Sequence, residues 1–160
     1  MTLSQKIAAA LDAQPEHGAL PTVLSVEDGA HRLTVHLTAA GPVGLAFSAL
    51  EFQTNARPAW SLEDLKAWGD RIAARVTYLM EPLIVLEQDP VGGEVEMRSQ
   101  SPTQRADQRA FYEVRLNRQG SLNLARMVYD ETTRRRRPAD CQLTREVLER
   151  LTDDFVASAG

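Results

Sequence analysis

The sequence predicts an α+β domain in which an antiparallel sheet carries helices on one side, in the order α-βββ-α-ββββ-α. Three observations predict this class. Short turn signals separate neighbouring strand-like segments, which favours antiparallel pairing. Stripes of apolar residues at helical spacing interrupt these strands. The length of 160 residues, with 43% hydrophobic and 25% charged residues, suits one domain over residues 1–160.

The sequence of the N-terminal half predicts a short helix followed by three strands. Ser4 can cap the helix, and Pro15 ends it. The segments 22–27 and 31–38 form a hairpin around Asp28-Gly29, a pair that readily adopts positive φ. A third strand follows Gly41-Pro42. Its apolar alternation slips by one residue, which predicts a β-bulge near Ser48–Ala49.

The clearest helix is predicted over residues 62–80. Ser61 is a strong N-cap, and Glu63 and Asp64 occupy the first turn, where negative charge is favourable. Pro82 stops the helix. Its apolar stripe consists of Leu62, Leu65, Trp68, Ile72, Val76 and Leu79.

Four strands and a helix are predicted for the C-terminal half. The segment 83–88 is apolar on both faces, which indicates a central strand or one covered on both sides. A half-exposed strand follows the turn 89–93, and the polar segment 101–109 is expected to be a loop. The segments 110–117 and 121–129 form a hairpin around Gly120.

The sequence at the C-terminal end predicts an exposed arginine-rich loop followed by a terminal helix. Residues 130–140 contain no apolar residue apart from Pro138 and Ala139, so this segment is expected to be a solvated loop. Leu143 and Leu148 then bracket an N-cap in the manner of a hydrophobic staple. An apolar stripe continues this helix to about residue 156.

Charge and cysteine content indicate a soluble cytoplasmic protein. The net charge is −4, so no chain-wide basic surface for nucleic acid exists, although residues 101–160 carry a positive excess. Cys141 is the only cysteine, which fits a reducing compartment. Neither a secretory signal nor an apolar run long enough to span a membrane is present.

This element order, together with the small size and the acidic charge, resembles the type III secretion chaperones, which are small, acidic, cytoplasmic dimers with α-βββ-α-ββ-α chains. The resemblance covers nearly the whole chain and has no sequence motif behind it. The additional strands before the terminal helix depart from the pattern. It implies a fold and a tendency to dimerise, without implying a particular partner.

No set of residues with useful specificity for catalysis or for a cofactor is found, and no metal site is expected. The chain lacks a phosphate-binding glycine-rich loop, and one cysteine excludes a thiolate zinc cluster. Cys141 follows Asp140, which would raise the pKa of its thiol. Four carboxylates gather around one predicted hairpin, namely Glu87, Asp89, Glu94 and Glu96. They could do acid–base work or bind Mg²⁺ or Ca²⁺, but most such pairs are simply the solvated side of an antiparallel strand.

The run Arg134–Arg137, with Arg126 on the preceding strand, is the feature that departs most from average composition. Four adjacent like charges are tolerated when anions are near. The alternatives are a loop balanced by its own acidic neighbours, an acidic protein segment or anionic ligand, and nucleic acid. Nucleic acid is disfavoured because no aromatic side chains are interleaved with the run.

The predicted helix 62–80 offers a second candidate surface. Leu65, Trp68 and Ile72 share one apolar face, which can pack on the sheet or form a seam with a second copy or another partner.

These patterns together favour a non-enzymatic protein-binding module, similar to a chaperone or adaptor and homodimeric. The alternative is a module that binds an anionic ligand or nucleic acid through Arg134–Arg137, and the third is an enzyme that uses Glu87, Glu94 or Glu96.

Overall fold

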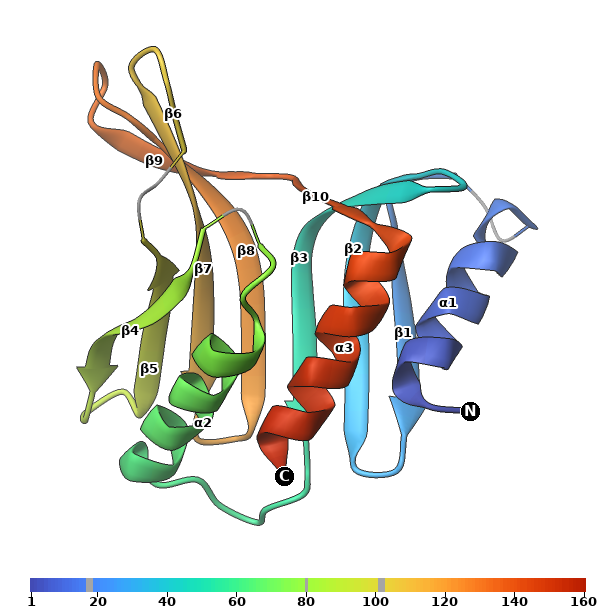
Figure 1. Cartoon of the computed structure of the whole chain (residues 1–160), viewed down its shortest axis with the longest axis horizontal. Helices are drawn as coiled ribbons and strands as arrows, with labels where there is room; N and C mark the ends of the chain where they lie inside the picture. Colours follow the sequence, from blue (N-terminus) through green and yellow to red (C-terminus); the bar gives the residue numbers. More distant parts are fainter. Residues whose placement is uncertain (17–18, 80, 101–102) are drawn as a thin grey trace.

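A computed structural model of the chain describes residues 1–16, 19–79, 81–100 and 103–160. It contains three α-helices, one short 3-10 helix and ten strands (Figure 1). The helices are α1 (Leu3–Ala13), α2 (Leu62–Arg75) and α3 (Arg145–Ala159), with the 3-10 turn η1 at Gln14–Glu16. The strands are β1 (Thr22–Asp28), β2 (His31–Ala40), β3 (Gly44–Thr54), β4 (Leu83–Asp89), β5 (Glu94–Ser99), β6 (Thr103–Arg105), β7 (Gln108–Asn117), β8 (Ser121–Asp130), β9 (Arg135–Ala139) and β10 (Cys141–Thr144).

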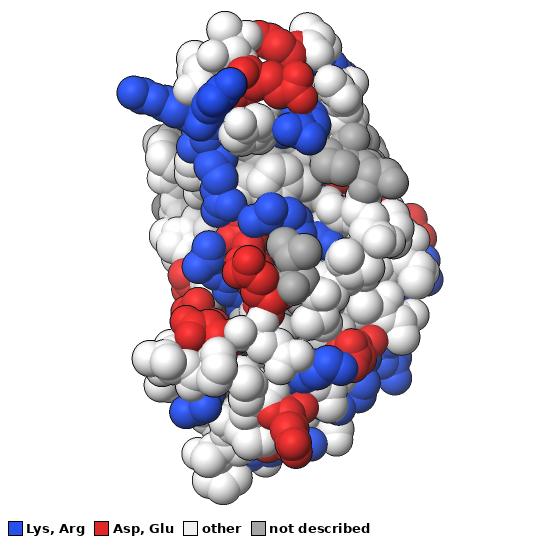
Figure 2. Space-filling model, turned by 90° about the vertical axis from the view of Figure 1, so that its left-hand side faces the viewer, with Lys and Arg blue, Asp and Glu red and all other residues white. Residues whose placement is uncertain are grey.

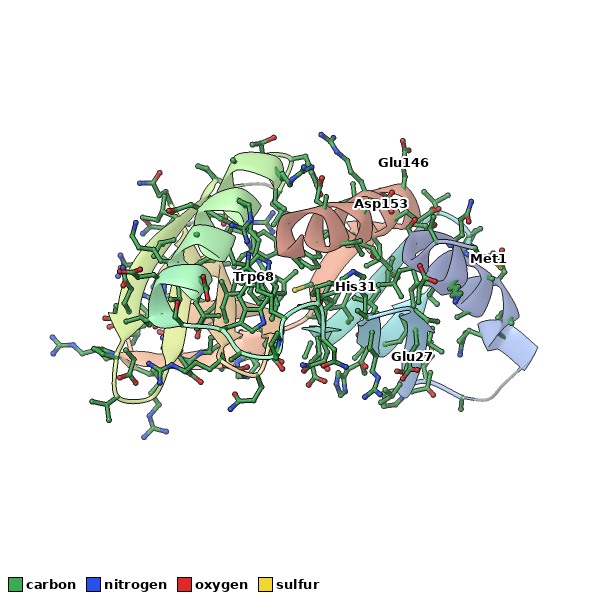
Figure 3. All side chains as sticks on the ribbon, turned by 90° about the horizontal axis from the view of Figure 1, so that it is seen from below. Met1, Glu27, His31, Trp68, Glu146 and Asp153 are labelled. Atoms are coloured by element: carbon green, nitrogen blue, oxygen red, sulfur yellow. The ribbon has the colours of Figure 1, made fainter. Side chains whose placement is uncertain are left out.

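All ten strands belong to one antiparallel sheet, which confirms the predicted α+β class. The main path runs β1-β2-β3-β8-β7-β5-β4, and β10, β9 and β6 pair with β3, β8 and β7 respectively. The three helices lie on the same side of this sheet (Figures 1 and 3). In the described part of the chain, no helix covers the opposite face, which we call the open face.

The sheet splits in its middle. β3 and β8 pair only through residues 50–53 and 121–124. Beyond this point β3 pairs with β10 and β8 pairs with β9, so the chain crosses from one half of the sheet to the other at Asp140. This crossing segment lies above the split (Figure 1).

Capping residues fix where the helices begin. The Ser61 hydroxyl accepts the Asp64 N–H, and the Asp64 carboxylate accepts the Ser61 N–H, which together form a capping box. These hydrogen bonds lower the pKa of Asp64 below its usual value. Thr144 caps α3 by accepting the Val147 N–H, without a capping box, and Thr2 caps α1 in place of the predicted Ser4.

Helix α2 ends at Arg75, five residues before the predicted end. The segment after it contains Val76, Thr77 and Tyr78, which are β-branched or aromatic and favour helix weakly. Val76 and Leu79 nevertheless remain buried, because the non-helical segment continues into the core. None of the three helices described here has the length and apolar character that a bilayer span requires.

The core lies between the helices and the sheet, and it contains the face of α2 that was a candidate seam. Leu65, Trp68 and Ile72 have no exposed surface. The Trp68 indole stacks on Trp60 with ring centroids 4.6 Å apart, and its N–H donates to the Ser158 Oγ at 3.0 Å (Figure 3). The prediction of a dimer or partner face at these three residues is therefore wrong, and the alternative of core packing holds.

The predicted turns and the bulge are confirmed. Gly29 and Gly120 adopt φ of +58° and +80° at the two predicted hairpins. In the β2–β3 pairing His36 lies opposite Ala49 and Leu37 lies opposite Phe47, so Ser48 is the extra residue of a bulge.

Three other predictions require correction, and β10 was not predicted. The apolar segment 83–88 forms β4 at the edge of the sheet, where α2 packs against it, so it is not the predicted central strand. The predicted loop 101–109 contains β6, whereas Ser101 and Pro102 lie outside the described residues. The predicted loop 130–140 contains β9, and β10 follows at 141–144. These three short strands are polar or very short, so they lack the apolar alternation by which strands are predicted.

Candidate functional sites on the two faces of the sheet

The arginine run lies on an exposed strand, and its residues point to both faces of the sheet. Arg134 occupies the turn before β9 with φ +58°. In the pairing with β8, Arg135 lies opposite Asp130, Arg136 opposite Tyr129 and Arg137 opposite Val128. Side chains alternate along a strand, so Arg136 lies on the open face and Arg135 and Arg137 on the helix side. The run is exposed, as predicted. The prediction that its four arginines form one cluster on a loop is wrong.

Arg126 does not join this run. Its side chain is 11% exposed and lies on the helix side of β8, where its Nη1 donates to the Glu81 Oε1 at 3.2 Å. The prediction that Arg126 extends the exposed arginine cluster is therefore wrong. The residue instead forms a buried ion pair with a partner that the sequence analysis did not single out.

The open face carries a patch in which arginine and aromatic side chains alternate. Arg109, Tyr129 and Arg136 lie side by side on β7, β8 and β9. The Arg109 Cζ is 5.2 Å from the Tyr129 ring centroid, and the Arg98 Cζ is 4.8 Å from that of Phe111. These five residues line a hollow of about 320 Å³, and we call them the Arg–aromatic patch.

Each guanidinium of this patch has one carboxylate neighbour. Arg98, Arg109 and Arg136 contact Glu96, Glu131 and Glu113, respectively, with nitrogen–oxygen distances of 3.0 Å in every case. The Arg98 Nε is buried and has no hydrogen-bond partner among the described residues. The Arg109 and Arg136 side chains are 44% and 41% exposed. The Arg109–Glu131 pair is exposed on both sides and therefore weak, so Arg109 can exchange Glu131 for another carboxylate, whereas the Glu113 partner of Arg136 is only 6% exposed.

The end of the sheet around β9 carries positive charge without acidic partners. Arg134, Arg135 and Arg137 have no carboxylate within ion-pair distance in the described part of the chain. Figure 2 faces the β4–β5 edge and shows basic side chains gathered toward the end where β6 and β9 lie. Acidic side chains lie between and below them in this view.

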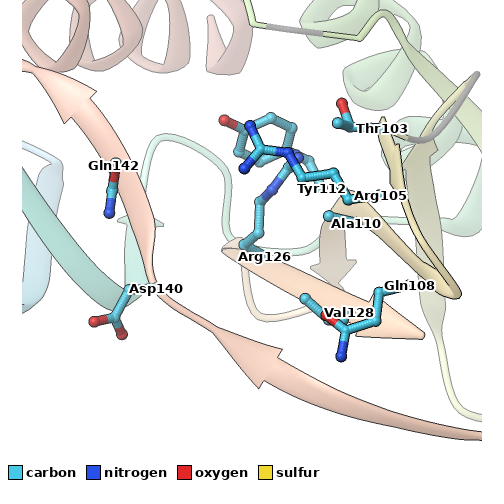
Figure 4. Close-up of a pocket in the computed structure, with 9 residues that line it drawn as sticks. All are labelled: Thr103, Arg105, Gln108, Ala110, Tyr112, Arg126, Val128, Asp140 and Gln142. Carbon is cyan, nitrogen blue, oxygen red and sulfur yellow. The ribbon is translucent and has the colours of Figure 1, made fainter. Parts of the chain in front are cut away.

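A second site lies on the helix side, where the split sheet leaves a cleft of about 300 Å³. Its lining comes from β6, β7 and β8 on one wall and from the crossing segment on the other (Figure 4). Arg105 and Arg126 extend toward the Tyr112 ring, and Asp140 and Gln142 lie across from them. We call this region the split-sheet cleft.

A buried polar network holds the floor of this cleft. The Glu81 side chain is 4% exposed and also accepts hydrogen bonds from the Ser99 Oγ at 3.1 Å and the Thr103 Oγ1 at 3.3 Å. The Arg126 Cζ lies 4.3 Å from the Tyr112 ring centroid. Because two hydroxyls and a ring hold the ion pair, the Arg126 guanidinium has one fixed orientation.

Cys141 lies next to this network with no exposed surface, and burial raises the pKa of its thiol to about 12. A thiol with such a pKa is protonated at neutral pH and is a poor nucleophile.

The three candidate carboxylates lie near one another, and two of them contact arginine side chains. Glu87 is exposed and lies opposite Glu96 in the β4–β5 pairing, and Glu94 and Glu96 share the open face as predicted. Arg115 contacts Glu94 at 3.7 Å, and Arg98 contacts Glu96. No group of three metal-ligating side chains occurs within residues 1–16, 19–79, 81–100 and 103–160.

Comparisons of the chain with protein-family models, with curated proteins and with solved structures gave no significant match.

Sequence reasoning missed most of the residues that form the two sites. Arg98, Arg109 and Tyr129 lie far apart in the chain, and only the strand pairing places them together. No aromatic side chain is interleaved with the arginine run in the sequence. In the folded chain, however, Tyr129 lies directly opposite Arg136.

Proposed function

We propose that the protein is a non-enzymatic binding module that holds an acidic segment of a protein partner on the open face, at the Arg–aromatic patch. The observation that carries this proposal is the row Arg109–Tyr129–Arg136, in which two half-exposed guanidinium groups flank one aromatic ring. Arginine and tyrosine are the residue types in which binding energy at protein interfaces concentrates.

The charges around the patch favour an acidic partner. Arg134, in the turn before β9, forms no ion pair among the described residues, whereas Arg135 and Arg137 lie on the other face of β9. A partner carboxylate can replace the exposed Glu131 at Arg109. Charge-assisted hydrogen bonds to guanidinium are the strongest type available at such a surface.

A protein segment fits this face better than nucleic acid. Only two aromatic rings, Phe111 and Tyr129, are available at the patch for base stacking. The resemblance to dimeric chaperones in size and acidic charge makes a homodimer part of the proposal. Light scattering measures the oligomeric state directly.

The test uses fluorescence anisotropy with a labelled octaglutamate peptide, an octaglutamine peptide of the same length, and a dT8 oligonucleotide. We expect octaglutamate to bind and octaglutamine not to bind. Binding should weaken as salt rises, because exposed charges are screened within about 8 Å at physiological ionic strength. Tighter binding of dT8 than of octaglutamate would overturn the choice of partner.

Matched variants on one strand separate the patch from general charge. Arg136→Gln and Arg109→Gln should each weaken octaglutamate binding about fivefold, which corresponds to about 1 kcal/mol per exposed charge pair. Arg135→Gln and Arg137→Gln remove the same charge from the other face of β9 and should change the affinity less than twofold. Equal losses in all four variants would contradict a role for the patch.

A further inference from the structure

A row of apolar side chains borders the row Arg109–Tyr129–Arg136, which we call the charged row. Phe111, Met127 and Pro138 lie opposite one another on β7, β8 and β9, and we call them the apolar row. Each of them is two residues away from a member of the charged row on the same strand. Because side chains alternate along a strand, both rows lie on the open face.

The apolar row is a local feature of a polar surface. Pro138 is exposed and Met127 is half-buried, whereas Phe111 lies beneath the Arg98 guanidinium and is 6% exposed. Beyond the small Ala125, the open-face side chains farther along β7 and β8 are polar, namely Glu113, Arg115, Asn117, Ser121 and Asn123. In the part of the chain that the structure describes, no helix covers this face (Figure 3). Methionine and aromatic residues are enriched at protein interfaces, so the apolar row is suited to contact with a partner.

The spacing of the charged row matches a helix better than an extended segment. Neighbouring strands lie about 4.8 Å apart, so the backbones of Arg109 and Arg136, two strands apart, are separated by about 10 Å. Residues seven apart on an α-helix lie nearly on one line and are separated by about 10.5 Å. In an extended segment, side chains on one face are separated by about 6.7 Å or about 13.4 Å, and neither spacing matches.

The presence of two rows also favours a helix. Two residues along a strand span about 7 Å, so the charged row and the apolar row run side by side across the same three strands. A helix presents two adjacent stripes of side chains to a surface, whereas an extended segment presents a single line of side chains.

The charged row can bind partner carboxylates without exposing a buried charge. Arg109 can exchange the exposed Glu131 for a partner carboxylate. Arg136 donates to the buried Glu113 through its Nη2 at 3.0 Å, and its guanidinium has further N–H donors for a second carboxylate.

We infer that the acidic partner segment is an amphipathic helix that crosses β7, β8 and β9, an inference that rests on the proposed function. Its acidic stripe lies on the charged row, with carboxylates seven residues apart at Arg109 and Arg136. Its apolar stripe lies beside the acidic stripe and packs on Met127 and Pro138. Recognition of a helix through one apolar stripe and one charged stripe is a common mode of peptide binding.

The test compares two helical peptides of identical composition by fluorescence anisotropy, with octaglutamate as the reference. Both peptides have 14 residues and carry glutamate at positions 3 and 10. The adjacent-stripe peptide has leucine at positions 4, 7 and 11, beside the glutamates, and the opposite-stripe peptide has leucine at positions 5, 8 and 12, on the far side of the helix. We expect the adjacent-stripe peptide to bind about tenfold more tightly, because only its leucines reach the apolar row. Circular dichroism checks that the two free peptides have the same helix content.

Variants of the protein locate the apolar contact. Met127→Ser and Pro138→Ser should each weaken binding of the adjacent-stripe peptide about fivefold. Both variants should bind octaglutamate within about twofold of the unmodified protein, which also shows that they are folded. Val23→Ser is the matched control, because Val23 is a 55% exposed apolar residue opposite His36 on the open face of β1, at the other edge of the sheet. This control should leave both affinities unchanged.

The results separate the form of the partner from the proposed function. Equal affinities of the two helical peptides would overturn the inference, and so would unchanged affinity of the adjacent-stripe peptide in both Met127→Ser and Pro138→Ser. Octaglutamate binding would still support the proposed function in either case. Absence of octaglutamate binding is the separate result that contradicts the proposed function.

Discussion

Replacement of Arg126 by Met tests the buried ion pair, because it removes the charge and keeps most of the side-chain volume. The change leaves the Glu81 carboxylate, 4% exposed, without its positive partner. The Ser99 and Thr103 hydroxyls still donate to it, yet they carry no charge. Breaking a buried pair by removing one partner destabilises a protein by about 3–5 kcal/mol.

Urea denaturation followed by the fluorescence of Trp60 and Trp68 measures this effect, since both rings are buried in the core. We expect Arg126→Met to lower the free energy of unfolding by about 3–5 kcal/mol. The double variant Arg126→Met/Glu81→Gln should recover about 2 kcal/mol or more, because the neutral amide no longer needs a cation.

Arg32→Met is the control for an exposed ion pair. Arg32 and Glu27 are 57% and 63% exposed, so the loss of this pair should change the free energy of unfolding by less than about 1 kcal/mol. A loss below about 1 kcal/mol for Arg126→Met, or no recovery in the double variant, would refute the assignment of Arg126 to a buried network.

Three further predictions concern the core, the arginine run and the buried thiol. Ile72→Ala should lower the free energy of unfolding by about 2–5 kcal/mol in urea denaturation, and Trp68→Glu should unfold the protein instead of giving a folded monomer by light scattering. Serine at all four positions of Arg134–Arg137 should change the free energy of unfolding by only about 1 kcal/mol, because the Arg136 side chain is 41% exposed and the buried Glu113 carboxylate keeps its contact with Arg115. Unfolding of this variant would contradict the exposed placement of the run. The pKa of Cys141 is raised in the folded state, so its contribution to stability is present below its ordinary pKa of about 8.5 and is lost as pH rises toward 12. Urea denaturation between pH 8 and pH 10 should therefore show a steeper loss of stability for the unmodified protein than for Cys141→Ala, and equal slopes would count against the burial of this thiol.

Local signals in the sequence identify the elements that pack against the core. The Ser61 cap, the Gly29 and Gly120 turns and the bulge at Ser48 each depend on a few neighbouring residues, and the structure confirms all four. Apolar periodicity also places Trp68 correctly on a buried stripe of α2. The periodicity of apolar residues does not determine whether such a stripe packs against the sheet of the same chain or against a second chain. The sequence therefore left both core packing and a dimer seam as alternatives.

The short polar strands escaped prediction for a physical reason. The backbone of β9 is ordered by hydrogen bonds to β8, and its side chains bury little apolar surface. The composition of residues 130–140 is therefore typical of a loop, although the backbone of β9 is extended and paired with β8. An exposed edge strand with several arginines is also a common way in which proteins prevent unwanted pairing at the edge of a sheet.

The two candidate sites depend on strand register, which short-range patterns do not determine. Tyr129 comes between Arg109 and Arg136 only because β7, β8 and β9 pair in that order. Glu81 and Arg126 are separated by 44 intervening residues, and only the fold places them 3.2 Å apart. The arginine run was therefore identified as unusual, whereas its division between two faces could not be predicted.

The position of an acidic peptide on the folded chain tests the central claim most directly. Titration of ¹⁵N-labelled protein with octaglutamate, followed by amide and arginine side-chain chemical shifts in NMR spectra, locates the bound peptide. We predict that the largest shift changes fall on Arg98, Arg109, Tyr129 and Arg136 of the open face, while Arg105 and Gln142 of the split-sheet cleft remain unchanged. Shift changes centred on the cleft or on the helices, or no changes at saturating peptide, would contradict the proposed function.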